Sequence, residues 1–313
     1  MSVRELVVLG TASQVPTRDR AHNGLLLRWG GRSVLIDPGE GTQRQLTLAG
    51  CSVTPLTDVL LTHAHGDHCL GLPGVLQRLS LDGAPGPVHV RFPTAAAPYV
   101  ERLRDATPYR QRTDVVLAPT EDGATVVADD GPDALALRAV ALSHGTVEHP
   151  VPCLAWRLSE PDGWRFDAEA LAATQVPPAA RRELASVGHV TVGGRRIDRH
   201  QVATQRRGRV VAVVMDTRDS DGARAAAADA DLLVIEATFR DDQRDLAEEV
   251  GHLTASGAAR LAQEAGARQV VLTHLSQRYP DRTGHLADAR AAAPGLDVHV
   301  AADLDVVPVP PHR

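Results

Sequence analysis

The 313-residue sequence contains no lysine, so all 33 of its cationic side chains are arginines, a bias that we attribute to genomic base composition. Cysteine is scarce as well, and Cys51, Cys69 and Cys153 predict neither a disulfide framework nor a thiolate zinc site. No apolar run approaches the roughly 18 residues of a membrane-spanning helix. Residues 1–5 enter a strand-like run without a signal peptide, so we expect a cytoplasmic protein with no membrane partner.

Charge is unevenly distributed along the chain. The formal net charge of −6 argues against a protein that binds nucleic acid over its whole surface. Residues 181–209, however, contain eight arginines and only two acids, which gives +6 there and leaves −12 for the remainder. The arginines of this segment are Arg181, Arg182, Arg195, Arg196, Arg199, Arg206, Arg207 and Arg209.

The most informative motif is the run 62–68 (THAHGDH), which directly follows an apolar, strand-like run. His63 and His65 are two residues apart on an extended chain and therefore project to the same side, while Asp67 and His68 follow where the chain turns. Imidazole and carboxylate groups suit zinc. Two zinc ions about 3.5–4 Å apart can stabilise both the attacking and the leaving oxygen of a displacement. The motif predicts a hydrolase with two metal ions.

Two metal ions need further ligands, and three candidates each lie just beyond a strand-like run. They are His144, Asp216 and His274. Side chains in loops that leave buried strands can converge on one edge of a sandwich. With the four residues of the first motif they make seven ligands, which is enough for two ions if Asp216 bridges them.

Strand-like and helical segments alternate through two similar halves of the chain, which predicts an α/β fold with two mixed sheets between outer helices. The hydrophobic pattern weakens between the halves. We therefore expect residues 1–159 and 210–313 to form one catalytic domain and residues 160–209 to form an inserted basic arm. The proline-rich residues 307–311 are expected to be frayed, and a helix is predicted over 252–265.

With these motifs the chain resembles ribonuclease Z, the tRNA 3′-processing endonuclease family of the metallo-β-lactamase superfamily. The resemblance spans about residues 6–279, and its narrower motifs are residues 39–45 (GEGTQRQ) and 273–279 (THLSQRY). It implies the αββα sandwich of the metallo-β-lactamase fold. It also implies a homodimeric, zinc-dependent phosphodiesterase that cuts precursor tRNA after the acceptor stem and leaves a 3′-hydroxyl on the tRNA.

The resemblance also assigns roles to individual residues. It implies one Zn²⁺ on His63, His65 and His144, a second on Asp67, His68 and His274, and Asp216 between the two. It further implies that Asp67 helps deprotonate the attacking water, and that His252, oriented by Glu236, gives a proton to the leaving ribose oxygen. Glu236 is a suitable partner because an imidazole acts as an acid near neutral pH only if its pKa stays close by. Arg278 and Tyr279, just past a ligand, are candidates for contacts with the substrate phosphate or ribose.

Two departures from the family pattern concern how the chain would bind and cut tRNA. The family's arm usually carries a Gly-Pro-rich motif, which is largely lost at residues 176–181 (VPPAAR). The arginines that follow would serve instead, because arginine neutralises phosphates and double-stranded RNA is read mostly through its shape and backbone. Residues 16–21 (PTRDRA) contain arginine in place of the family's lysine and lack its asparagine. The cleavage position and the response to a CCA end therefore stay open.

Two other interpretations remain. The same metal site could hydrolyse small phosphodiesters or sulfate esters, with the basic arm acting as a spacer rather than a clamp. Alternatively, the chain could be a non-catalytic RNA-binding module, but the intact set of ligands argues against that. The sequence does not determine which metal is bound, how many subunits associate or how broad the range of RNA substrates is.

Overall fold

The structure is a computed structural model that describes residues 3–127 and 133–312. Residues 1–2, 128–132 and 313, which belong to the predicted catalytic domain, lie outside the described residues. Within the described ranges, none of the helices has both the length and the apolar character needed to cross a lipid bilayer.

The chain divides into two compact units. The larger unit comprises Met1–Leu158 and Val210–Pro310, and the smaller unit comprises Ser159–Arg209 and Pro311–Arg313. The larger unit is built on two seven-stranded sheets.

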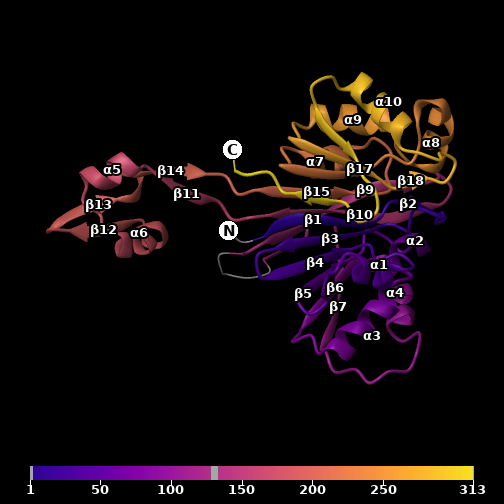
Figure 1. The fold of residues 1–313 in the computed structure, drawn as a ribbon, viewed down its shortest axis with the longest axis horizontal. Helices are drawn as coiled ribbons and strands as arrows, with labels where there is room; N and C mark the ends of the chain where they lie inside the picture. The colour runs from indigo at the N-terminus through magenta and orange to yellow at the C-terminus, as the bar shows by residue number, and fades with distance from the viewer. Residues whose placement is uncertain (1–2, 128–132, 313) are drawn as a thin grey trace. The chain divides into compact units, whose positions relative to one another are not determined.

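The first sheet has the strand order β20-β1-β3-β4-β5-β6-β7. Its strands are β1 (Arg4–Gly10), β3 (Gly24–Trp29), β4 (Arg32–Ile36), β5 (Leu56–Leu60), β6 (Val88–Pro93), β7 (Val115–Thr120) and β20 (Val306–Pro308). Strands β4 to β7 pair parallel, whereas β1, β3 and β4 pair antiparallel. Three helices pack on its outer face, α1 (Thr42–Leu48), α3 (Leu72–Asp82) and α4 (Ala97–Arg104) (Figure 1).

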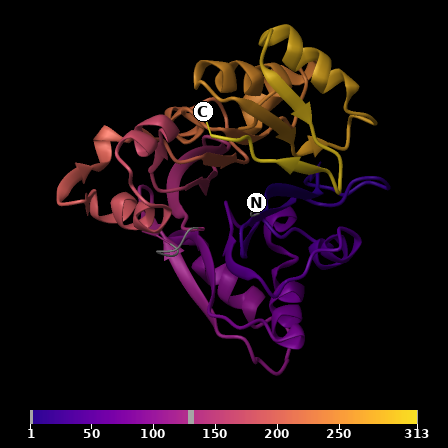
Figure 2. The same cartoon turned by 60° about the vertical axis from the view of Figure 1, so that its left-hand side comes forward.

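The second sheet has the strand order β19-β17-β16-β15-β10-β9-β8. Its strands are β8 (Thr125–Val127), β9 (Ala136–Gly145), β10 (Pro150–Ser159), β15 (Val210–Val214), β16 (Leu232–Glu236), β17 (Gln269–Thr273) and β19 (Asp297–Val300). The helices on its outer face are α7 (Asp221–Ala227), α9 (Ala255–Glu264) and α10 (Thr283–Ala292). In Figure 2 the indigo and purple helices lie on one side of this unit and the orange and yellow helices on the other.

The alternation of side chains along each strand produces the layers. In β1, Leu6 and Val8 point into the core between the two sheets, whereas Val7 and Leu9 point toward the helices of the first sheet. Strands buried on both faces read as continuous apolar runs, as β1 does. The predicted αββα sandwich is therefore confirmed.

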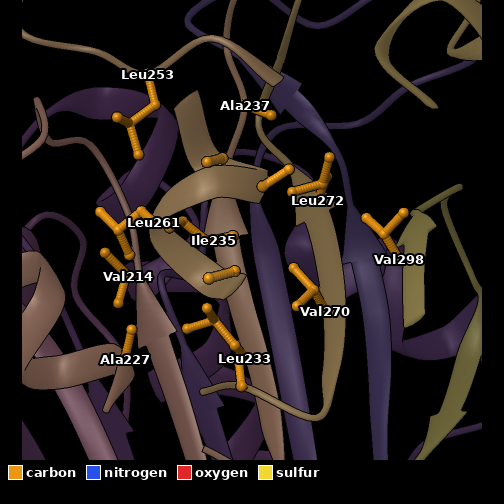
Figure 3. Close-up of a cluster of buried hydrophobic side chains, with 14 of the residues drawn as sticks. Val214, Ala227, Leu233, Ile235, Ala237, Leu253, Leu261, Val270, Leu272 and Val298 are labelled. Atoms are coloured by element: carbon orange, nitrogen blue, oxygen red, sulfur yellow. The ribbon is translucent and has the colours of Figure 1, made fainter. Parts of the chain in front are cut away.

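The outer layer of the second sheet is shown in Figure 3. Val214, Leu233 and Ile235 pack there against Leu261 of α9 and Ala227 of α7. Burying an aliphatic side chain of this size contributes about 1.5–3 kcal/mol relative to leaving it exposed. This layer holds β15, β16 and β17 in place, and the ends of these strands carry part of the candidate site.

The prediction that residues 307–311 are frayed is wrong for residues 307 and 308, which belong to β20. Val307 pairs with Leu6 of β1 and is buried. Pro308 is compatible with this pairing because β20 is an edge strand, where proline's missing N–H need not serve a further strand.

The described part of the smaller unit contains two antiparallel strand pairs and two short α-helices. The pairs are β11 (Gly163–Phe166) with β14 (Ala203–Arg206) and the hairpin of β12 (His189–Val192) with β13 (Arg195–Asp198), and the helices are α5 (Ala168–Ala173) and α6 (Arg181–Val187). Gly193 and Gly194 connect β12 to β13 with φ of 56° and 81°, the left-handed backbone that a tight hairpin turn requires. The unit has its own small apolar core, formed by Leu171, Val176, Leu184, Val190, Ile197 and Val202.

Candidate active site

The predicted metal ligands lie where loops leave the strands of the larger unit. The run 62–68 follows β5 and enters the short helix α2 (Gly66–Cys69). His144 lies near the end of β9, Asp216 lies two residues after β15, and His274 directly follows β17. Loops from both sheets thus supply the cluster, as the sequence predicted.

Three buried residues of the site adopt positive φ angles, which are uncommon for residues other than glycine. The angles are 48° for Asp37, 33° for Asp216 and 61° for His274. Strained backbone of this kind persists only where the surrounding structure enforces it, and it concentrates at functional sites.

The first ligand group consists of His63, His65, His144 and Asp216, whose donor atoms all lie within 4.8 Å of one another. Nε2 of His63 and Nε2 of His144 each lie 3.6 Å from Oδ2 of Asp216. Nε2 of His144 lies 3.4 Å from Nδ1 of His65. Three imidazoles thus surround one oxygen of a single carboxylate.

The second group consists of Asp67, His68 and His274, again with donor atoms within 4.8 Å. Nε2 of His68 and Nε2 of His274 lie 3.1 Å apart. Each lies 3.3 or 3.4 Å from Oδ2 of Asp67 and from Oδ1 of Asp216. Asp216 therefore turns one carboxylate oxygen to each group.

These distances fit metal coordination. Ligands held tetrahedrally about 2.1 Å from a zinc ion lie about 3.4 Å from one another, which is close to the separations in both groups. Nε2 of His63 and Oδ1 of Asp216 are buried and have no hydrogen-bond partner among the described residues. A buried polar atom left in that state is costly, and a cation at the centre of each group would satisfy both atoms. The His and Asp residues therefore form a metal-binding cluster.

The predicted catalytic pair lies beside this cluster. Nδ1 of His252 is 2.9 Å from Oε1 of Glu236, and Nε2 of His252 is 4.0 Å from Oδ2 of Asp216. Glu236, at the end of β16, is fully buried. It also accepts hydrogen bonds from the backbone N–H groups of Thr217 and Thr238. The structure brings the predicted pair and the predicted ligands together.

His252 does not begin a helix, contrary to the prediction for residues 252–265. Helix α9 begins at Ala255, and the side chain of Thr254 caps it by accepting a hydrogen bond from the backbone N–H of Gly257. A cap residue has extended backbone, so the residues before it belong to a loop. His252 consequently lies on that loop, where its ring reaches the cluster.

The electrostatics separate His252 from three of the ligand imidazoles, His63, His65 and His144, whose pKa values burial lowers. The ligand His68 differs from these three, because Asp216, Asp67 and Asp37 outweigh its burial and raise its pKa. Burial disfavours the charged form of His252, but Glu236 and Asp216 outweigh burial and raise its pKa to about 9. Burial lowers the pKa of His63 well below its ordinary value, and the neighbouring His68 adds to this effect. His63 is thus neutral with a lone pair for a cation, while His252 carries a proton that it can donate.

A cavity of about 700 Å³ opens onto the cluster. Its lining combines the metal-binding and catalytic side chains His65, Asp67, His144, Asp216, His252 and His274 with the polar residues Ser13, Gln14, Ser276, Gln277 and Arg278 and the apolar residues Val151, Phe239, Leu246 and Val250. Ser13 and Ser276 meet here because β2 (Ala12–Ser13) pairs parallel with β18 (Leu275–Ser276).

The two residues predicted to contact substrate near this cavity differ in their placement. Arg278 is exposed and lines the cavity. Tyr279 is only 8% exposed. Its hydroxyl donates to Oδ1 of Asp242 and accepts from the backbone N–H of Arg240. We therefore correct the prediction for Tyr279, which has a structural role in this loop.

The arm arginines also differ from one another. Arg209 is 8% exposed, and its guanidinium donates to Glu160 at 3.0 and 3.1 Å, so it is a structural residue rather than a substrate contact. The guanidinium of Arg199 lies 3.8 Å above the ring of Trp164. Arg206 is half-buried, whereas the remaining arginines, Arg181, Arg182, Arg195, Arg196 and Arg207, are exposed.

The sequence analysis assigned no role to three residues that hold the site together, Asp37, Thr62 and Thr238. Nδ1 of His68 lies 2.8 Å from Oδ2 of Asp37, and this carboxylate is fully buried. Asp37 directly follows β4, just as His274 directly follows β17. Its position at the end of a strand could therefore have identified Asp37 from the sequence.

The chain is also similar to known proteins. Residues 17–153 match the metallo-beta-lactamase superfamily, and residues 202–275 match a beta-lactamase superfamily domain. The chain is 49% identical over 313 residues to Ribonuclease Z of Salinispora arenicola and 48% identical over 313 residues to Ribonuclease Z of Nocardia farcinica. Both matches span 100% of this chain, together with 98% and 100% of the respective relatives.

Among solved structures, the crystal structure of human tRNase Z, short form, matches with a TM-score of 0.66 and 25% identity, covering 98% of this chain and 99% of that one. The fold and the site define a metal-dependent hydrolase of the metallo-β-lactamase superfamily. Within that superfamily, the chain belongs to the ribonuclease Z family.

Proposed function

We propose that this protein is an endoribonuclease of tRNA 3′-end maturation. It cuts precursor tRNA after the acceptor stem and leaves a 3′-hydroxyl on the tRNA and a 5′-phosphate on the trailer. One observation carries the proposal. Asp216, between two groups of metal ligands, shares a cavity with the His252–Glu236 pair, in a chain that matches Ribonuclease Z proteins over its full length.

The cluster would hold two Zn²⁺ ions per subunit, one on His63, His65 and His144 and the other on Asp67, His68 and His274, with Asp216 shared. When bound, such ions lower the pKa of water and neutralise charge on the phosphate oxygens. Asp67 is held toward the cavity by the backbone N–H of Gln14, which donates to its Oδ2 at 2.7 Å. From that position Asp67 accepts the proton of the attacking water.

The second proton transfer belongs to His252. As the bond between phosphorus and the ribose 3′-oxygen breaks, Nε2 of His252 gives its proton to that oxygen. Glu236 stabilises the charged ring before the transfer through the hydrogen bond at Nδ1. General acid catalysis of this kind contributes roughly 10²–10⁴-fold in rate.

The smaller unit would bind the backbone of the tRNA. Five exposed arginines support this role, namely Arg181, Arg182, Arg195, Arg196 and Arg207. Arg206 and Arg199 would add to the positive field from their less exposed positions, whereas Arg209 would not contact RNA. The enzyme would act in the cytoplasm as a homodimer, in which the arm of one subunit presents tRNA to the active site of the other.

The test is incubation of the purified protein with a 3′-extended precursor tRNA, with the cut mapped to the nucleotide. We expect one cut after the acceptor stem, which a chelator abolishes and added Zn²⁺ restores, and no cut by Asp67→Ala. Tight tRNA binding without cleavage would instead favour an RNA-binding module. Hydrolysis of a small chromogenic diester without cleavage of tRNA would favour the small-ester hydrolase.

A further inference from the structure

Two buried carboxylates hold the histidines of this site through the same pattern of contacts. The first is Asp37, whose Oδ2 lies 2.8 Å from Nδ1 of His68. The same oxygen accepts a hydrogen bond from Oγ1 of Thr62 at 2.7 Å. That hydroxyl oxygen in turn lies 3.0 Å from Nδ1 of His63. Asp37 thus contacts one histidine directly and a second through a threonine.

Glu236 repeats the pattern in the second half of the chain. Its Oε1 lies 2.9 Å from Nδ1 of His252, and its Oε2 accepts a hydrogen bond from Oγ1 of Thr238 at 2.7 Å. Oγ1 of Thr238 lies 2.9 Å from Nδ1 of His274. Thr62 and Thr238 are 0% and 2% exposed, so both contacts are buried.

A threonine hydroxyl has one proton and two lone pairs, which fixes the direction of each hydrogen bond. Backbone N–H groups also donate to both carboxylates, from Thr62 to Asp37 and from Thr217 and Thr238 to Glu236. Each carboxylate can act only as an acceptor, so each threonine hydroxyl uses its single O–H to donate a hydrogen bond to the carboxylate. The hydroxyl oxygen can then only accept, and Nδ1 of the neighbouring histidine must carry the proton.

The proton on Nδ1 determines the state of the other ring nitrogen, Nε2. With Nδ1 protonated, Nε2 of His63 and of His274 keeps its lone pair. Nε2 of His63 lies 3.6 Å from Oδ2 of Asp216, and Nε2 of His274 lies 3.3 Å from its Oδ1. Each threonine therefore directs one lone pair toward a different ligand group.

We propose that Thr62 and Thr238 are matching positioning residues, one for each metal ion, that select the tautomer in which His63 and His274 present Nε2 to the metal. Thr238 has a second effect, because Glu236, which accepts its hydrogen bond, also contacts Nδ1 of His252. It thereby connects a ligand of the second ion to the proton donor.

The experiment compares Thr62→Val and Thr238→Val with Thr62→Ser and Thr238→Ser. Valine preserves the shape of threonine without its hydroxyl, and serine preserves the hydroxyl. Zinc affinity is measured by competition with a chelator of known affinity, and ring ¹⁵N spectra of the zinc-loaded protein report the tautomers. Loss of outer hydrogen-bond partners typically weakens metal binding 10–100-fold. We expect such a loss for the ion on His63 in Thr62→Val and for the ion on His274 in Thr238→Val, with the serine variants within about threefold of wild type.

Valine variants with wild-type affinity for both ions would overturn the proposal, as would serine variants that lose as much affinity as the valine ones. The wild-type spectrum decides the matter even if a valine variant fails to fold, because a proton on Nε2 of His63 or His274 contradicts the proposed tautomer. The inference rests on the proposed two-zinc site. A wild-type protein that binds no zinc would refute that site, whereas unchanged valine variants of a zinc-binding protein would refute only the role of the threonines.

Discussion

Nδ1 of His252 lies 2.9 Å from Oε1 of Glu236, a carboxylate with no solvent exposure. The contact orients the ring so that Nε2 faces the cavity, 4.0 Å from Oδ2 of Asp216. That proximity allows two roles for His252, proton donor or additional metal ligand. Mutagenesis distinguishes them, since only a ligand is needed to retain the metal.

We expect His252→Ala to lower kcat for precursor tRNA by roughly 10²–10⁴-fold, because the leaving oxygen then departs without a general acid. Zinc content should stay at the wild-type level, since all seven proposed ligands remain. Single-turnover cleavage and elemental analysis of the same preparation measure both quantities. Loss of one zinc would show that His252 is a ligand, and wild-type turnover would exclude it as the acid.

The arm prediction concerns Arg181, Arg182 and Arg195, all of them exposed. Replacing the three with glutamate should weaken tRNA binding and reduce the slope of log K against log salt by about 0.7–0.9 for each phosphate that the arm no longer neutralises. Hydrolysis of a small chromogenic diester should be unaffected. Arg102→Glu, a reversal at an exposed position of α4 in the larger unit, is the matched control. An unchanged salt slope would mean that these arginines do not bind tRNA.

Metal removal should lower stability as well as activity. Asp216 and Asp67 are 2% and 9% exposed, and without cations their charges have only the histidines to balance them. Zinc at a hundredfold excess over its dissociation constant should stabilise the fold by about 2.7 kcal/mol for each independent site. Calorimetry of chelated and zinc-restored protein measures this. Mg²⁺, which prefers oxygen ligands, is the control and should have little effect. Identical unfolding temperatures for chelated and zinc-loaded protein would contradict the site.

Stability should also fall with acidity because of His285, a fully buried residue of α10 whose ring lies 4.8 Å from that of Tyr279. Burial lowers its pKa to about 4. An unfolded histidine has a pKa of about 6.5, so between pH 6.5 and 4 the unfolded chain binds a proton that the folded chain does not. His285 therefore reduces the free energy of unfolding as pH falls through this window, by about 3 kcal/mol in total.

His285→Gln removes this titration, so its urea-unfolding free energy should decline less between pH 7 and pH 4 than that of the wild type. Above pH 7 the two profiles should run parallel, because His285 is then neutral in both the folded and the unfolded chain. If the unfolding free energies of the two proteins also run parallel between pH 7 and pH 4, the pKa of His285 is the same in the folded and the unfolded chain.

The sequence predicted the ligand set because each ligand lies at, or within a few residues after, the end of a strand, and strand ends can be recognised from local apolar runs. His144, Asp216 and His274 were found in this way. The roles of Thr62 and Thr238 depend on which buried carboxylate each hydroxyl meets, and that contact exists only once the two sheets have packed. Local patterns contain no such information.

The incorrect predictions have a related cause. Tyr279 and Arg209 are residue types that often bind nucleic acid, but here Asp242 and Glu160 occupy their polar groups. Burial and pairing of this kind cannot be read from composition. The strand β20 was missed because the prolines in and after it suggested disorder, whereas its place at the edge of a sheet is a property of the whole fold.

The separation of the ligands along the chain has a consequence during synthesis. His68 and His274 are neighbours in space but 206 positions apart in sequence, and Ser276 of β18, which lines the cavity, comes after both. A ribosome must therefore translate past Ser276 before the reactive centre can assemble. Incomplete nascent chains contain the early histidines without their late partners, so they cannot cleave the RNA that surrounds them.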